Sequence, residues 1–279
     1  MSEIKINNID NINMIDDLII KTLNCSLNSD IKISNGAKAV NNGKKYEKDV
    51  YCVVKDTYIN DKKFNIQNEN ELGGNSYRPD MKCIYNNLDI IKELKNDVNA
   101  EFIQVDVIKE ETWISKNKSK HPLSVYKRYE DEINLQDNLF YGILPPLNKT
   151  RKEFDEWETV QSKLKQKDEK YKNKKRISKE YSWISKDKHF IKLNYKDKGC
   201  HYIQIKDYGL YHLGEDICNF NVPEFNPESV KIRLRCKRRQ GKNCVPSSIT
   251  VSSYPYKLEK SNYSLDTIEK LPLNLIYKK

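Results

Sequence analysis

The chain has 279 residues, enough for one large domain or two small ones with a buried core. Hydrophobic residues make up 37% and charged residues 32%, which excludes a wholly disordered protein. The 50 basic and 40 acidic residues give a net charge of +10. This excess favours a polyanionic partner, although a composition bias that produces solvated lysines explains it equally well.

Cysteine usage and hydropathy indicate the compartment. The seven cysteines form no Cys-x-x-Cys pair, which argues against a zinc ribbon or a disulfide framework. No apolar run approaches the length of a membrane-spanning helix, and the first residues do not resemble a signal peptide. We therefore expect a soluble, intracellular protein, in the cytoplasm or nucleus of the cell that makes it, with no membrane contact.

Two helices are predicted in the first part of the chain. Residues 1–35 predict a helical lead-in, because isoleucine and leucine recur there at helical spacing. Residues 44–58 predict a second helix, whose apolar stripe consists of Tyr46, Val50, Val54 and Tyr58. Glu47 lies at the edge of this stripe. Such an acid is either an ordinary surface residue or a side chain that points inward at a site.

The pattern over residues 81–95 predicts a β-hairpin, preceded by an edge strand over 62–66. Two apolar runs, 81–85 and 88–95, flank Asn86-Asn87, which can supply the positive φ angles of a tight turn. Alternation places Glu93 and Lys95 on one face of the second strand. The hairpin would also return Asp80 to a place beside Glu93.

These three residues suggest a chemistry. A carboxylate pair suits a hard cation that keeps several waters, which describes Mg²⁺. A lysine beside the cation can orient or activate the attacking water and neutralise charge on a phosphate. Asp80, Glu93 and Lys95 therefore predict a metal-dependent phosphodiester-cleaving site. The plainer alternative is a hairpin with an exposed Glu–Lys ion pair.

The middle of the chain is strongly charged. We expect a helix from Asn99, a fair N-cap, to about Lys109, with Gln104 in its first two turns. Residues 116–186 are mostly helical in pattern. A dense basic patch within them contains Lys174, Lys175 and Arg176. A solvated surface is the alternative for each cation in that patch.

From residue 189 the pattern predicts strands, over 189–195, 201–205, 209–214 and 230–239. In the last of these, apolar residues alternate with basic ones, so that one face is cationic. We expect this face to bind nucleic acid, through phosphate or base contacts of Arg233, Arg235, Arg238 and Arg239. Positive charge that protects an edge strand is the alternative.

Gly73-Gly74, Pro79-Asp80 and Glu93-Leu94-Lys95 together resemble the signature of the PD-(D/E)XK nuclease superfamily, which includes type II restriction endonucleases. The resemblance covers roughly residues 40–110. It implies an α/β (α+β) fold, with a restriction-endonuclease-like mixed central sheet flanked by helices. Its implied metal ligands are Asp80, Glu93 and the Leu94 carbonyl. Lys95 would position the water, Glu47 would add a metal or water contact, and Gln104 a polar contact.

The activity that this resemblance implies is Mg²⁺-dependent endonucleolytic hydrolysis of double-stranded DNA, with a possible homodimer for cleavage of both strands. We expect residues 1–35 to precede a nuclease domain over 36–240. This domain would carry a charged helical insertion at about 116–186, and a C-terminal tail, 241–279, would pack on it. The alternatives are a non-catalytic nucleic-acid-binding protein and a resolvase or exonuclease of the same fold.

Overall fold

The computed structural model describes residues 35–66, 79–85, 87–109, 111–115, 120–137, 139–168, 180–238 and 246–278. The chain divides into two compact units, residues 1–41 and 42–279. The predicted helical lead-in lies outside the described residues, apart from Asn35. All the sheets that the described residues form belong to the second unit. In the described part of the chain, no helix is long and apolar enough to cross a membrane.

The central sheet has five strands in the order β10-β9-β5-β4-β3. Neighbouring strands are antiparallel, except that β5 and β9 run parallel, so the sheet is mixed. The strands are β3 (Asn65–Ile66), β4 (Met81–Tyr85), β5 (Leu88–Lys95), β9 (Tyr202–Ile205) and β10 (Gly209–His212).

A second sheet, here called the antiparallel sheet, has the order β7-β6-β12-β11-β8. Its strands are β6 (Phe102–Lys109), β7 (Trp113–Ser115), β8 (Glu180–Ile184), β11 (Ser229–Arg238) and β12 (Pro246–Tyr256). A small third sheet consists of β1 (Thr57–Ile59), β2 (Lys62–Lys63) and β13 (Leu275–Tyr277). The C-terminal residues thus provide β12, the middle strand of the antiparallel sheet. The coarse α+β class is confirmed.

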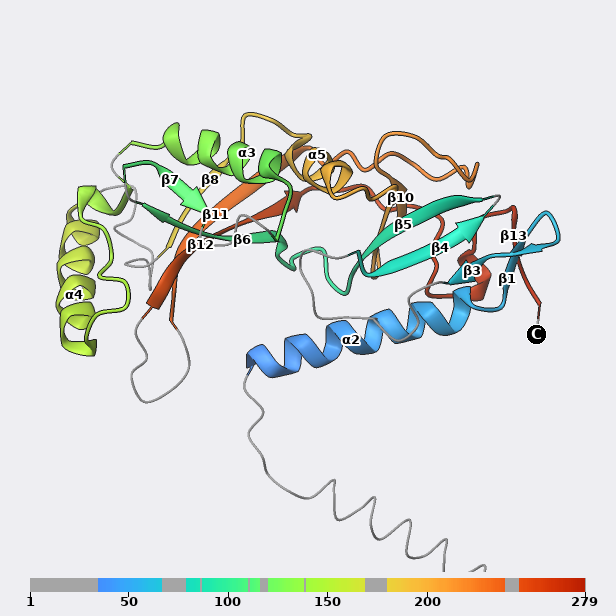
Figure 1. Ribbon diagram of the computed structural model, residues 1–279, viewed down its shortest axis with the longest axis horizontal. Coiled ribbons are helices and arrows are strands. Elements are labelled where there is room, and N and C mark those ends of the chain that lie inside the picture. The colour runs from blue at the N-terminus through green and yellow to red at the C-terminus, as the bar shows by residue number, and fades with distance from the viewer. Residues whose placement is uncertain are drawn as a thin grey trace, which may run out of the picture. The chain divides into compact units, whose positions relative to one another are not determined.

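Helices flank these sheets, as Figure 1 shows. They are α2 (Asn35–Val54), α3 (Leu123–Asn134), α4 (Arg151–Lys167) and α5 (Phe190–Asp197), with 3-10 turns at Leu139–Gly142 and Ile268–Lys270. Buried side chains of α2 pack with those of β4 and β5. Side chains of α3 and α5 pack with the antiparallel sheet and with β9. The end of β5 therefore lies between two layers of helix.

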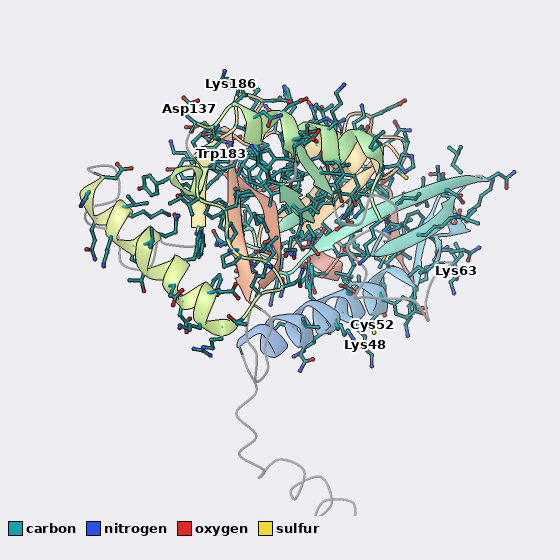
Figure 2. All side chains as sticks on the ribbon, turned by 60° about the vertical axis from the view of Figure 1, so that its left-hand side comes forward. Lys48, Cys52, Lys63, Asp137, Trp183 and Lys186 are labelled. Carbon is teal, nitrogen blue, oxygen red and sulfur yellow. The ribbon has the colours of Figure 1, made fainter. Side chains whose placement is uncertain are left out.

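Helix α2 is amphipathic, as the sequence predicts. Tyr46, Val50 and Val54 are buried, whereas Lys48 and Cys52 point outward from the opposite side (Figure 2). The helix begins before the predicted residue 44 and ends at Val54, so the predicted end at residue 58 is wrong.

The β4–β5 hairpin has the bounds that the sequence predicts. Met81 pairs with Lys92 and Tyr85 with Leu88, which leaves a two-residue connection. Asn87 has φ 61°, a left-handed conformation that asparagine tolerates. In the second half of β5 both faces are buried, because a helix layer covers each side of the strand.

The predicted helix over 99–109 is wrong, because these residues form β6. Val105 and Val107 are buried in alternation with the partly exposed Gln104 and Asp106, which is the period of a strand. Asn99, expected as an N-cap, instead donates its backbone N–H to the Asp97 side chain in a tight turn. Short polar side chains such as asparagine and aspartate are favoured both in tight turns and at helix N-caps, so the sequence alone does not distinguish the two structures.

The predicted strand over 189–195 is also wrong, because residues 190–197 form α5. Its buried residues recur at helical spacing and are Phe190, Ile191, Asn194 and Tyr195. Asp187 accepts the backbone N–H of His189 at 2.8 Å, just before the helix begins. The predicted strands at 201–205, 209–214 and 230–239 correspond to β9, β10 and β11. However, β10 ends at His212, and residue 239 lies outside the described residues. The expected strand at 62–66 is divided between β2 and β3.

Lys92 lies fully buried in the cluster between α2 and the central sheet. Its Nζ is 4.0 Å from the centre of the Phe64 ring and 5.8 Å from that of Phe220. Among the described residues this nitrogen has no hydrogen-bond partner. Burial lowers the pKa of Lys92, which means that the fold disfavours its protonated form.

We expect Lys92→Met to raise the free energy of unfolding by about 1 kcal/mol or more, because it removes a buried amine that has no hydrogen bond. The lost ring contacts are worth about 2 kcal/mol or more for a buried ammonium group, but burial lowers the pKa of Lys92 and so weakens this contribution. Since the folded pKa lies below the unfolded one, the gain shrinks as pH rises toward the ordinary lysine pKa of 10.5. Urea unfolding near neutral pH measures it. Lys82→Met, a more exposed position on β4, is the control; a less stable Lys92→Met protein contradicts the prediction.

Candidate active site

The β4–β5 hairpin brings Asp80, Glu93 and Lys95 together. Asp80 directly precedes β4, and its Oδ2 accepts the backbone N–H of Leu94 at 2.8 Å. Glu93 and Lys95 project from the same face of β5, and their side chains form an ion pair of 2.9 Å. The turn and the strand register therefore place an acid from one strand beside an acid and a lysine from the next.

Glu93 lies between two lysines. Its Oε1 contacts Lys95 Nζ at 2.9 Å and its Oε2 contacts Lys198 Nζ at 3.1 Å. Both Glu93 and Lys198 have buried side chains, with 4% and 1% of their surface exposed. Burial alone would raise the pKa of Glu93, but the two ammonium groups lower it below its ordinary value. Glu93 is therefore ionised, and both of its oxygens are engaged.

Glu47 reaches the same region from α2. The residue is 9% exposed, and its Oε2 has no hydrogen-bond partner among the described residues. Burial raises the pKa of Glu47 and the charge of Glu93 raises it further, while Lys95 opposes the shift. Of the two interpretations that the sequence left open for Glu47, the inward-pointing one holds.

Acidic side chains are crowded together in this cluster. Three carboxylates, of Glu47, Asp80 and Glu93, face the ammonium groups of Lys95 and Lys198. Burial, and then the charges of Glu93 and Glu47, raise the pKa of Asp80 to about 8, against the opposing effect of Lys95. A shift of this size, in a group with a specific charged neighbour, is typical of functional sites.

Gln104 belongs to a different element from the one that the sequence predicts. It belongs to β6 and not to the start of a helix, and its backbone forms a hydrogen bond with His121. His121 is buried, and this burial, with the nearby charge of Lys198, lowers its pKa to about 4. The imidazole is therefore neutral near pH 7. A further link from β6 to the cluster is Phe102, whose ring centre is 5.8 Å from Lys95 Nζ.

The carboxylates of the cluster are donors of the kind that a divalent cation takes, but they are not arranged as a formed metal site. In the described part of the chain, no three His, Cys, Asp or Glu side chains are grouped closely enough to hold a metal ion. The Glu47 Oε2 atom has no hydrogen-bond partner among the described residues, and burial, together with the charge of Glu93, raises the pKa of Asp80. Carboxylate oxygens are the donors that Mg²⁺ prefers, and it usually keeps waters at its other positions. Glu93 would have to exchange at least one lysine contact for the cation.

The predicted nucleic-acid contacts are only partly described. Lys174, Lys175, Arg176 and Arg239 lie outside the described residues, as does the side chain of Arg238. Arg233 and Arg235 lie on β11 and form ion pairs with Glu101. Because β11 lies between β12 and β8, it is not an edge strand, so the edge-protection alternative is wrong.

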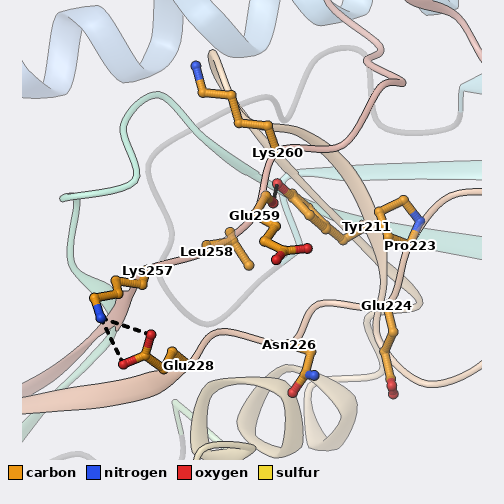
Figure 3. Close-up of a pocket in the computed structure, with 9 residues that line it drawn as sticks. All are labelled: Tyr211, Pro223, Glu224, Asn226, Glu228, Lys257, Leu258, Glu259 and Lys260. Atoms are coloured by element: carbon orange, nitrogen blue, oxygen red, sulfur yellow. Dashed lines mark hydrogen bonds and ion pairs between the residues drawn. The ribbon is translucent and has the colours of Figure 1, made fainter.

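A cavity of about 740 Å³ lies elsewhere, beside the segments that flank β11 and β12 (Figure 3). Its lining shares no residue with the cluster. Lys257 pairs with Glu228 at 3.0 Å, and Lys192 pairs with Glu224 at 2.8 Å. Glu224 and Glu228 are largely exposed, whereas Glu47 and Glu93 are buried, so we assign the candidate active site to the cluster around Glu93 and not to this cavity.

Sequence reasoning missed Lys198, His121 and Tyr195. Lys198 follows α5 and is 105 residues from Glu93. Burial, with the charges of Glu93 and Asp80, raises the pKa of Tyr195 well above its ordinary value. The sequence around these residues carries no motif. Only the correct assignment of 190–197 as a helix, followed by a strand parallel to β5, would have directed attention to them.

We expect Asp80→Asn to stabilise the metal-free protein, because the amide keeps an acceptor for the Leu94 N–H and removes the crowded charge. The folded pKa of Asp80 is raised from 3.8 to about 8, so its ionisation destabilises the fold increasingly as pH rises through this window. The gain in Tm should reach at least about 2 °C. It should be larger at about pH 8 than at about pH 5.

Thermal unfolding in EDTA at the two pH values measures this effect. Asp89→Asn, an exposed acid on the same hairpin, is the matched control and should change Tm little at either pH. A gain for Asp80→Asn that does not depend on pH, or a loss of stability, contradicts the prediction.

Comparisons with known proteins gave no match. No family model matches the sequence, and neither a curated protein nor a solved structure is significantly similar to the chain. A function is therefore inferred from the side chains of the cluster and from the elements that hold them.

Proposed function

We propose that the chain is a Mg²⁺-dependent nuclease of the PD-(D/E)XK type that hydrolyses phosphodiester bonds in double-stranded DNA. The observation that carries the proposal is the convergence of Asp80, Glu93 and Lys95 at one end of the β4–β5 hairpin. Carboxylates that can hold a divalent cation, with a lysine beside them, are suited to this hydrolysis.

The surrounding elements support the same proposal. The central sheet is mixed, with α2 on one face and α5 on the other. Helix α2 carries Glu47, and Lys198 directly follows α5. A mixed sheet flanked by helices, with an acid supplied by the preceding helix, is what the resemblance to restriction endonucleases implies.

Each residue of the cluster has a role in this proposal. Asp80 and Glu93 would hold Mg²⁺, with Glu47 and the Leu94 carbonyl as further oxygen donors. When bound, the ion supplies a Lewis acid and lowers the pKa of water. Burial alone would lower the pKa of Lys95, but Glu93 and Asp80 raise it, so Lys95 stays protonated. Its ammonium group can orient the attacking water and neutralise charge that develops on the phosphate.

The substrate class follows from charge and from the resemblance. The net charge of +10 favours a polyanion, whose phosphates lysine and arginine can neutralise. Hydrolysis of both strands of a duplex would be served by a homodimer, with one cluster for each strand. A resolvase or an exonuclease would use the same chemistry on a branched or linear substrate.

A non-catalytic nucleic-acid-binding protein is the second candidate, and the pairing of Glu93 favours it. Both Glu93 oxygens contact lysines, as they would in a buried ion network with a structural role only. Metal binding separates the candidates. A nuclease site binds Mg²⁺ and loses this binding in Asp80→Asn, whereas a structural network has no such dependence.

Plasmid cleavage tests the nuclease directly. With Mg²⁺, the wild-type protein should nick or linearise supercoiled plasmid, and EDTA should abolish the reaction. Asp80→Ala and Lys95→Ala should each reduce the rate by about 100-fold or more, because each removes a group that contacts the reacting phosphate, the water or the cation. Asp89→Ala, from the exposed part of the same hairpin, is the matched control and should keep wild-type activity.

Cleavage that survives both substitutions would end the proposal, as would a wild-type protein that is inactive with Mg²⁺ on every substrate. Linear, circular and branched DNA should be compared. Attack on closed circles identifies an endonuclease, dependence on free ends identifies an exonuclease, and a preference for junctions identifies a resolvase.

A further inference from the structure

A second group of charged side chains lies on the antiparallel sheet. Glu101 directly precedes β6, Arg233 and Arg235 lie on β11, and Tyr254 lies on β12. A single oxygen, Glu101 Oε1, contacts the Nη2 atoms of Arg233 and Arg235 and accepts a hydrogen bond from the Tyr254 hydroxyl at 3.2 Å. Three donors from two strands therefore meet at the position of one anionic oxygen.

The donors exceed what this carboxylate oxygen needs. One arginine would suffice to join the start of β6 to β11 by an ion pair, but two share the oxygen. The Nε atoms of both arginines are buried and have no hydrogen-bond partner in the described part of the chain. Glu180, the other acid near Arg233, is 3.9 Å away. Because the two Nε atoms are buried, a ligand can reach only the terminal guanidinium nitrogens. Two guanidinium groups that meet at one point are suited to an anion that has several oxygens.

The donors are held in place and can be reached from solvent. The Arg233 guanidinium lies 4.7 Å from the centre of the Tyr254 ring, a cation–π distance. The side chains of Arg233, Arg235 and Glu101 are 21%, 28% and 25% exposed. A ligand can therefore approach the two arginines, provided that Glu101 moves away.

This group lies close to the candidate active site along the chain. The short segment 96–100 connects Lys95 at the end of β5 to Glu101. Phe102, the next residue after Glu101, has its ring centre 5.8 Å from Lys95 Nζ. A nucleic acid held at the two arginines would lie beside the residues that are proposed to cleave it.

We propose that Arg233, Arg235 and Tyr254 form a binding site for a backbone phosphate of nucleic acid, and that Glu101 occupies this site until the phosphate displaces it. The choice of nucleic acid as the source of the phosphate rests on the proposed function. A phosphodiester offers two non-bridging oxygens that the paired guanidinium groups can bind. Displacement frees Glu101. The segment 96–100, which would move with Glu101, connects it to Lys95 of the candidate active site.

Binding of a short DNA duplex in EDTA, measured by fluorescence anisotropy, tests this without cleavage. Glu101→Gln keeps the shape of the side chain and removes the competing charge, so it should tighten binding by about tenfold. Arg235→Gln should weaken binding, and it should reduce the slope of log affinity against log salt by about 0.9. Lys63→Gln, which removes an exposed cation on β2 of the small sheet, is the charge-matched control (Figure 2).

A folded Glu101→Gln protein with unchanged or weaker binding overturns the proposal. If this variant does not fold, Arg235→Gln decides, and a salt slope equal to that of the wild type overturns it. Competition identifies the source of the phosphate: inorganic phosphate that binds where duplex does not would reject nucleic acid as the ligand. Duplex binding that behaves as expected, with no cleavage in Mg²⁺, would reject the nuclease and keep this site.

Discussion

The hydrogen bond from the Leu94 N–H to the Asp80 carboxylate connects the residue before β4 to the end of β5. It is formed where α2 and α5 cover the two faces of the sheet, so the carboxylate is partly withdrawn from water. Burial and the neighbouring acids raise the pKa of Asp80 to about 8. The backbone thus positions an acid that its surroundings disfavour in the charged form.

The cluster around Asp80 shows how the fold tolerates such crowding. Lys95 and Lys198 stabilise the charge of Glu93, and Lys95 and Lys44 favour the charged form of Glu47, yet burial still raises the pKa of both Glu47 and Asp80. Charged groups that lack full compensation persist where the surrounding packing is strong enough to hold them. Here the packing is that of α2 and β5, which bury large apolar side chains on both sides of the acids.

The sequence predicted the hairpin and the positions of Asp80, Glu93 and Lys95, because neighbouring residues alone determine this part of the fold. Alternation and the Asn86-Asn87 pair specify the strands, their register and their turn without reference to the rest of the chain. The residues at 99–109 and 190–197 were assigned to the wrong elements, since polar turn residues and short apolar runs occur in both classes. Helix α2 was predictable in type, but its end was not.

The rest of the site depends on contacts between distant segments. Lys198 reaches Glu93 only because α5 leads into β9, which pairs in parallel with β5. Glu101 meets Arg233 and Arg235 only because β12 brings β11 and β6 into one sheet. In the sequence, the basic residues of β11 look like a row of unpaired cations. In the structure, Arg233 and Arg235 are both paired with Glu101. The alternation of charged residues along a strand predicts which side chains share a face. It does not predict which acids from other segments pair with them.

The late position of β9 and β12 in the chain has a consequence for synthesis. Glu93 and Lys198 are 105 residues apart. At a translation rate of about 5–20 residues per second, β5 therefore waits roughly 5–20 s for its parallel neighbour. During this time its edge is open to wrong pairing, which makes nascent chains a target for chaperones. A chain that ends before residue 198 holds Asp80, Glu93 and Lys95 without Lys198, so the complete cluster forms only after synthesis has passed this residue.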